Sequence, residues 1–83
     1  MDRSSIVLTA EQQLLVENSL EFVHWTIARL ISQSNCHIEY DDLFQEGCVA
    51  LCHAAASYHG GTSFKTYAIT VIRNHLIDCC RKQ

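Results

Sequence analysis

The sequence predicts an all-α fold, a compact domain of three principal helices with the first and second antiparallel. Two features of the composition support this prediction: the 83 residues contain no proline and only three glycines. The chain therefore has few residues that would interrupt a helix. A third observation is that apolar residues recur three and four positions apart over three long stretches. We assign a lead-in segment to residues 1–8 and one small helical domain to residues 9–83.

The first helix is expected over about residues 10–32. Thr9 and Gln12 have the spacing of a capping box, in which the threonine side chain binds the backbone N–H of the glutamine and the glutamine side chain returns to the threonine N–H. One face of this helix is apolar and is predicted to pack on the core. It consists of Val16, Leu20, Val23, Ile27 and Leu30.

Two ring side chains lie off this apolar face. Trp25 is either an exposed functional aromatic or, together with Phe22, part of a second packed face, and we favour packing. His24 is interpreted as a solvated or hydrogen-bonded imidazole. The helical spacing ends in the polar segment 32–40, which we expect to form a loop with Ile38 turned inward.

The second helix is expected over about residues 42–58. Asp41 or Asp42 can cap its first turn, and Gln45 follows Asp42 by three positions, where its side chain can reach back to the cap. Gly47 costs about 1 kcal/mol relative to alanine inside a helix, so we expect a packing or contact reason for it. The predicted apolar face consists of Phe44, Cys48, Leu51, Ala55 and Tyr58.

The third helix is expected over about residues 64–82. It follows a turn at residues 59–61, whose glycines tolerate a left-handed backbone, and its N-cap is Thr62 or Ser63. Its predicted core side consists of Phe64, Ala68, Val71 or Ile72, His75 and Cys79, extended by Ile69, Leu76 and Cys80. Its opposite, mixed and polar side consists of Tyr67, Thr70, Asn74, Asp78 and Arg81.

Charge is distributed unevenly along the chain. Residues 1–59 contain two basic and eight acidic residues, a net charge of −6, whereas residues 60–83 contain four basic residues and one acidic residue, a net charge of +3. This asymmetry indicates one acidic and one basic partner surface, with the C-terminal third as the candidate for phosphate contact.

The five cysteines are interpreted as free thiols that pack as small apolar groups in a reducing cytoplasm. Their number is odd, no CxxC occurs, and Cys48, Cys52 and His53 form only an isolated CxxxCH. We therefore predict no disulfide framework, no bound metal and no cofactor. No apolar run approaches the roughly 20 residues that span a bilayer. The sequence also shows no combination of a nucleophile, a base and a group that orients the base, so we do not expect an enzyme.

Two strings in order resemble region 2 of the sigma-70 family, the initiation factors of bacterial RNA polymerase. The first is DLFQEGCVALCHAAASY, and the second, after a short loop, is FKTYAITVIRNHLIDCCRK. Family members carry a DLxQEG helix followed by small residues and leucine, and then an F-x-T-Y-A helix that ends in an I-R-N type run and basic residues. The resemblance covers roughly residues 9 to 82 and implies a protein that binds polymerase and promoter DNA.

The resemblance implies that the DLxQEG helix docks on the clamp coiled coil of the polymerase's largest subunit. Asp42, Gln45 and Glu46 would meet arginines there, because carboxylates form charge-assisted, often bidentate bonds with guanidinium groups. Leu43, also expected at this contact, and Phe44 would flank or underpin them. The alternative that the residues alone leave open is a solvated acidic turn favoured by the helix dipole.

The resemblance also implies that the third helix reads and opens the promoter's minus-ten element. Phe64, Thr66 and Tyr67 match the segment on which a flipped adenine stacks, although both rings are alternatively core residues, Phe64 above all. Asn74 would read the upstream duplex edge, with Ile77 one turn on. The other expected contacts are Thr70 and, at phosphates, the basic residues Lys65, Arg73, Arg81 and Lys82.

Two departures from the family pattern narrow this interpretation. Thr70 and Val71 stand where housekeeping members carry a pair of tryptophans that wedge the duplex open, which indicates an alternative sigma factor. No helix-turn-helix for the minus-thirty-five element follows, so we expect an excised domain or a truncated relative. The rival hypothesis is a sigma-like interaction module that binds polymerase or an anti-sigma protein without engaging DNA.

Overall fold

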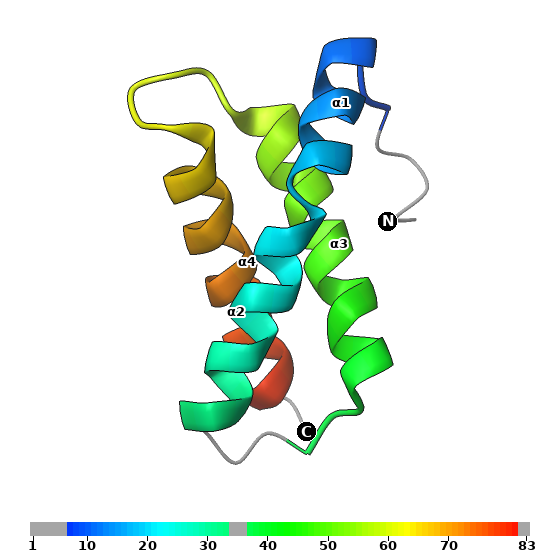
Figure 1. The fold of residues 1–83 in the computed structure, drawn as a ribbon, viewed down its shortest axis with the longest axis vertical. Helices are drawn as coiled ribbons and strands as arrows, with labels where there is room; N and C mark the ends of the chain where they lie inside the picture. Colours follow the sequence, from blue (N-terminus) through cyan, green and yellow to red (C-terminus); the bar gives the residue numbers. More distant parts are fainter. Residues whose placement is uncertain (1–6, 34–36, 82–83) are drawn as a thin grey trace.

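The computed structural model describes residues 7–33 and 37–81, and within these ranges the chain forms four α-helices and no strand. They are α1 (Ala10–Asn18), α2 (Leu20–Gln33), α3 (Tyr40–Ser57) and α4 (Phe64–Arg81). In Figure 1 the chain descends along α2, rises along α3 and descends again along α4, while α1 stands beside the upper end of α3. The all-α class is confirmed, with four helices in place of three. None of the helices in these ranges is long and apolar enough to cross a membrane.

The expected first helix is divided at Ser19. The Ser19 N–H donates to the Val16 carbonyl at 3.1 Å, and the Ser19 carbonyl accepts from the Phe22 N–H at 2.9 Å, so both bonds span three residues instead of four. Ser19 has φ −117° and ψ 8° and is 4% exposed. Serine neither favours nor breaks a helix strongly, which is why the spacing pattern contained no sign of the division. Because the chain is divided at Ser19, α1 is a separate helix from α2, and it packs chiefly against α3.

The N-terminus of α1 is closed by the predicted capping box. The Gln12 N–H donates to Thr9 Oγ1 at 3.1 Å, and the Thr9 N–H donates to Gln12 Oε1 at 2.8 Å. The box satisfies two donors that a first helical turn otherwise leaves without a partner. No residue of α1 is fully buried, so the cap stabilises a helix that has little core packing of its own.

The core lies where α2, α3 and α4 meet. Val23 and Ile27 of the apolar face expected for the first helix are fully buried, whereas Leu20 is partly exposed at 37%. Ile38 turns inward from the loop and packs against the core, as predicted. The buried cluster consists of Val23, Ile27, Leu43, Ala50, Leu51, Ala54, Ala68, Ile72 and Leu76. The residues at its border are Val16, Leu30, Ile38, Phe44, Phe64, Tyr67, Val71 and Cys80.

The buried face of α3 is rotated from the predicted one. Leu51 and Ala55 are buried as expected, but Phe44, Cys48 and Tyr58 are only partly buried. The face that packs consists of Leu43, Gly47, Ala50, Leu51, Ala54 and Ala55. Glycine and alanine carry little weight in an apolar pattern, which is why this face was missed. They nevertheless allow neighbouring helices to approach closely, because interaxial distance depends on the side chains at the contact.

Gly47 marks such a close approach between α3 and α2. A Cβ at this position would lie 2.5 Å from Val23 Cγ1 and 3.8 Å from Ile72 Cγ2. The first distance is far inside van der Waals contact, and Val23 is fully buried in a close-packed interior that offers little room for it to move. The packing reason expected for this mid-helix glycine is therefore confirmed.

The turn between α3 and α4 also follows the prediction. Gly60 and Gly61 both have φ 93°, a backbone conformation that glycine adopts without steric cost. Ser63 Oγ then accepts the Thr66 N–H at 3.2 Å and caps α4. The turn therefore begins and ends on residues whose backbone preferences specify it.

Candidate protein-binding and nucleic-acid surfaces

The first two turns of α3 present acid and amide groups, and we call Asp42, Gln45 and Glu46 the acidic turn. The N-cap of α3 is Glu39, whose side chain makes no capping bond, and both Asp41 and Asp42 lie inside the first turn. The predicted aspartate cap is therefore wrong, because α3 begins at Tyr40, before both aspartates. Asp42 and Gln45 are exposed, so their oxygens are accessible to a partner.

Glu46 is less exposed than predicted because it joins α3 to α4. Its Oε1 lies 2.9 Å from His75 Nε2, and the Glu46 and His75 side chains are 22% and 37% exposed. An imidazole N–H donating to a carboxylate is a charge-assisted hydrogen bond, and it gains ion-pair character when the imidazole is protonated. Glu46 therefore stands at the edge of the acidic turn and fixes the neighbouring helix at the same time.

Leu43 lies beneath the acidic turn. It is fully buried in the core, so of the two roles expected for it, flanking or underpinning the acidic turn, its burial matches underpinning. Phe44 is partly buried and stacks on His24, with ring centroids 4.5 Å apart and planes 20° apart. His24 Nδ1 hydrogen-bonds the Tyr40 hydroxyl, which confirms the interpretation of His24 as a hydrogen-bonded imidazole.

The residues expected to contact DNA fall into three groups. Those that are exposed are Lys65, Thr66, Thr70, Arg73, Asn74 and Arg81. Those that are partly buried are Phe64, Tyr67 and Ile77. Lys82 lies outside the described residues. Thr70, Asn74 and Arg81 recur at helical spacing and form one exposed polar strip along α4.

Tyr67 stands at the edge of this strip and packs against the core. Its hydroxyl lies 2.9 Å from Ser57 Oγ at the end of α3. Its ring centroid is 5.8 Å from that of Tyr58, and Phe64 meets the same Tyr58 ring edge-on at 5.2 Å. Both residues are partly buried and pack against the core, so the alternative in which the rings belong to the packing is favoured for Phe64 and Tyr67 alike, and each keeps part of its surface accessible.

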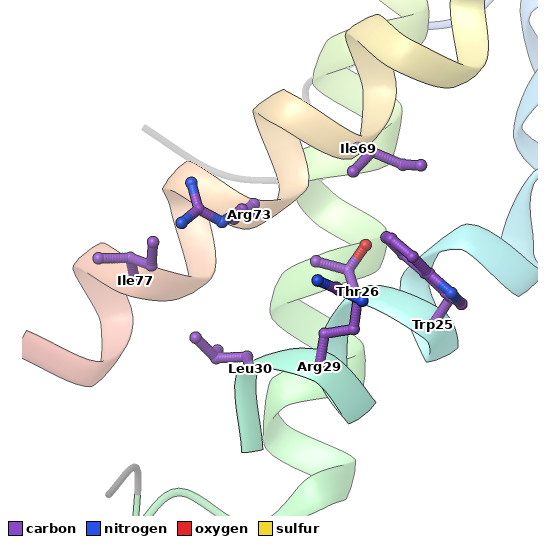
Figure 2. A pocket seen from close by; sticks show the side chains of 7 residues that line it. All are labelled: Trp25, Thr26, Arg29, Leu30, Ile69, Arg73 and Ile77. Carbon is purple, nitrogen blue, oxygen red and sulfur yellow. The ribbon is translucent and has the colours of Figure 1, made fainter. Parts of the chain in front are cut away.

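A groove between α2 and α4 was not predicted. We call it the arginine groove, a hollow of about 460 Å³ lined by Trp25, Thr26, Arg29, Leu30, Ile69, Arg73 and Ile77. Figure 2 shows that its α2 residues face its α4 residues across the hollow, so Arg29 and Arg73 belong to opposite walls. The groove therefore has one arginine on each wall, and guanidinium groups suit the binding of an anionic ligand.

Trp25 is the aromatic residue of this groove. It is 51% exposed, so the expectation that it packs in a second buried face is wrong. The Arg29 Cζ lies 4.9 Å from the Trp25 ring centroid, within the range of a cation–π contact. The available signal was the spacing of four between these two residues, which places both side chains on one helix face.

A second hollow of about 440 Å³ adjoins the arginine groove and shares Trp25 and Ile69 with it. It is lined by Glu21, Phe22, Trp25, Lys65 and Ile69. The Lys65 Nζ lies 5.7 Å from the Phe22 ring centroid. The two hollows together place Lys65 and the two groove arginines along one side of the α2–α4 pair.

The cysteines depart from the prediction of five free thiols. Cys48, Cys52 and Cys79 carry thiols. Burial raises the pKa of Cys48 and Cys52, and repulsion from Cys52 adds to the rise at Cys48. Cys80 is disulfide-bonded, so the prediction is wrong there, because sequence spacing does not show which distant sulfurs meet. Cys36 lies outside the described residues.

One comparison with known proteins identifies a family. The family model described as Sigma-70 region 2 matches residues 15–83. No curated protein and no solved structure matched the chain. The matched range begins within α1 and includes the acidic turn, all of α4 and both walls of the arginine groove.

Proposed function

Because the chain belongs to the sigma-70 region 2 family, we propose that it binds core RNA polymerase with the acidic turn and promoter DNA with α4 and the arginine groove. Membership implies a sigma-factor-like role in polymerase binding and promoter recognition, and the family is not one of enzymes. The observation that carries the proposal is the exposure of Asp42 and Gln45 on either side of the fully buried Leu43. We take the domain to span residues 9–83.

The proposed polymerase contact is a charge-assisted one. Leu43, anchored in the core, holds the first turns of α3 in place, so Asp42 and Gln45 present their oxygens from a rigid helix. The proposed partner is the clamp coiled coil of the largest subunit, whose arginine guanidinium groups would bind such oxygens in pairs. The acidic balance of residues 1–59 supports association with a basic surface.

The proposed DNA contact combines phosphate binding with base recognition. Asn74 lies on the exposed polar strip, and its amide can pair with an adenine edge in the major groove. Lys65, Arg73 and the newly found Arg29 would bind phosphates, which position the domain without reading sequence. Trp25 offers a stacking surface beside them, and base stacking on an aromatic ring contributes roughly 1–3 kcal/mol. Opening of the promoter's minus-ten element is also part of the proposal, and it would use the accessible part of the Tyr67 ring.

The polymerase half is tested with the double variant Asp42→Ala/Gln45→Ala. We expect its affinity for core polymerase to fall at least about tenfold, about 1.4 kcal/mol, in a calorimetric titration. The free energy of unfolding should change by less than about 0.5 kcal/mol per substitution, because both side chains are exposed. Glu11→Ala/Gln13→Ala removes the same two group types from the exposed start of α1 and is the matched control. Unchanged affinity in the first variant contradicts the proposal.

The packing of Tyr67 favours a second candidate function. Its ring packs against the core and its hydroxyl contacts Ser57, which leaves less of the ring for stacking with a base. The overall net charge of −3 also disfavours DNA binding. In this alternative the chain is a sigma-like interaction module that binds polymerase or an anti-sigma protein through the acidic turn alone. The two candidates are distinguished by whether the polymerase-bound chain binds a minus-ten-like single strand. The first function predicts such binding and predicts that Arg73→Ala weakens it. Polymerase binding without such DNA binding selects the alternative.

A further inference from the structure

Three potential metal ligands meet where α3 packs against α4. Glu46 comes from α3, and His75 and Cys79 come from α4, where a spacing of four places them on the same helix face. One ligand atom from each residue, a carboxylate oxygen, an imidazole nitrogen and the Cys79 Sγ, lies within 4.8 Å of the other two. All three residues are partly buried, and none is among the groups we assign to DNA contact, although Glu46 also belongs to the acidic turn.

We propose that Glu46, His75 and Cys79 bind a divalent transition-metal ion, with Zn²⁺ as the best match. Thiolate, imidazole and carboxylate are the three ligand types that Zn²⁺ takes in proteins, and a hard cation such as Mg²⁺ or Ca²⁺ would select oxygen atoms alone. The inference does not depend on the proposed function, since it rests on these three side chains only.

The geometry requires small movements. Tetrahedral Zn²⁺ with bonds of about 2.0–2.3 Å holds its ligand atoms about 3.3–3.6 Å from one another. The Glu46 Oε1 and His75 Nε2 are already 2.9 Å apart, and Cys79 Sγ would move by roughly one ångström at most to complete the set. The side chains of His75 and Glu46 are 37% and 22% exposed, so solvent can reach the ion and supply a water as fourth ligand.

Binding changes protonation in a defined way. The Cys79 thiol loses its proton to solvent and binds as thiolate, and Glu46 binds as carboxylate. His75 binds through the lone pair of Nε2, with its remaining proton on Nδ1, so the hydrogen bond between His75 and Glu46 is replaced by two bonds to the ion. About one proton is released per ion when the imidazole is neutral beforehand.

The sequence alone could not reveal this set, because Glu46 and His75 are 29 positions apart. The competing thiols are Cys48 and Cys52, which lie one turn apart on α3. Burial raises the pKa of both, which disfavours the thiolates that a metal needs. The set around Cys79 combines three ligand types from two helices and is the stronger site among the described residues.

The test is titration of the full chain with Co²⁺ and then Zn²⁺ under anaerobic conditions. Thiolate-bound Co²⁺ gives a sulfur-to-metal charge-transfer absorption, and we expect it to saturate at one ion per chain and to be displaced by Zn²⁺. Cys79→Ser should abolish this absorption. Cys79→Ser and His75→Gln should each weaken binding at least about tenfold, since even removal of a ligand's hydrogen-bond partner costs roughly 10–100-fold.

The matched control is Cys48→Ser/Cys52→Ser, which removes two thiols but keeps the proposed ligands. It should bind Co²⁺ as the parent does, with the same absorption. Circular dichroism and the thermal midpoint without metal establish that each variant is folded, and Zn²⁺ should raise the midpoint of the parent and of this control but not of His75→Gln. Loss of binding in the control, or a parent that takes up no Co²⁺, overturns the proposal whatever the chain does with polymerase.

Discussion

The acidic turn and the arginine groove are built in different ways. The three residues of the acidic turn lie within positions 42–46 of a single helix, above the buried Leu43. The groove needs two helices, because Arg29 and Arg73 reach it from α2 and α4. The first surface therefore depends mainly on local helix formation, whereas the second exists only where the core holds α2 and α4 together. This difference predicts unequal responses to substitution.

The largest effect is expected for a core residue that holds α4, one wall of the arginine groove, in place. Ile72 is fully buried on α4, and Ile72→Ala should lower the free energy of unfolding by about 2–5 kcal/mol in urea denaturation. Thr70→Ala, at an exposed position of the same helix, is the control and should change it by less than about 0.5 kcal/mol. A loss below about 1 kcal/mol for Ile72→Ala would show that this core does not hold α4. The groove would then not depend on the core in the way that we infer.

The next effect separates the groove from the rest of α2. Trp25→Ala should weaken binding of a single-stranded oligonucleotide by the polymerase-bound chain by about 1–3 kcal/mol, measured by fluorescence anisotropy. Ile31→Ala removes an apolar side chain, 45% exposed, that does not line the groove and should leave this affinity unchanged. Equal losses in both variants would mean that general apolar contact, and not stacking on Trp25, accounts for binding.

A smaller effect is expected in the salt dependence of the same binding. Arg73→Ala should reduce the slope of log affinity against log salt by about 1, because one phosphate contact is lost, while Arg73→Lys should keep the slope. Asp42→Ala belongs to the other surface and should not lower the slope. If Asp42→Ala and Arg73→Ala reduced the slope equally, the two surfaces would not be functionally distinct.

The smallest effect concerns the Cys48 and Cys52 thiols, which belong to neither surface. Burial raises their pKa in the folded chain, so the folded state holds their protons at a pH where the unfolded state has lost them. Their contribution to stability is present below about pH 8.5 and declines as the pH rises through the folded-state pKa. Unfolding free energies should therefore fall less steeply with rising pH, above about pH 8.5, in Cys48→Ser/Cys52→Ser than in the parent. Parallel curves for the parent and this variant would contradict the assignment.

Features of the fold that depend on a few neighbouring residues could be predicted from the sequence. The capping box of Thr9 and Gln12, the Ser63 cap and the turn at residues 60–61 are each specified by side chains or backbone preferences within three positions. The exposure of Asp42 was predictable for the same reason. The family resemblance followed from contiguous strings and was confirmed over residues 15–83.

Features that depend on contacts between distant residues could not be predicted. The arginine groove and the bond between Glu46 and His75 arise only when α4 docks, and neither leaves a spacing signal in the chain. The buried face of α3 was missed because its glycine and alanines are selected by the closeness of neighbouring helices and not by hydrophobicity. The division at Ser19 is likewise a property of packing, since serine tolerates both helix and turn.

The close approach at Gly47 also limits how this domain can vary. A saturation mutagenesis library should return no larger residue at Gly47 unless Val23 becomes smaller in the same clone, so the two positions would behave as one coupled unit. Gly60 and Gly61 have open space around them, so their backbone conformation at φ 93°, and not a neighbouring side chain, restricts substitution there. A substitution that changes how closely α3 approaches α2 must therefore be made in both helices at once.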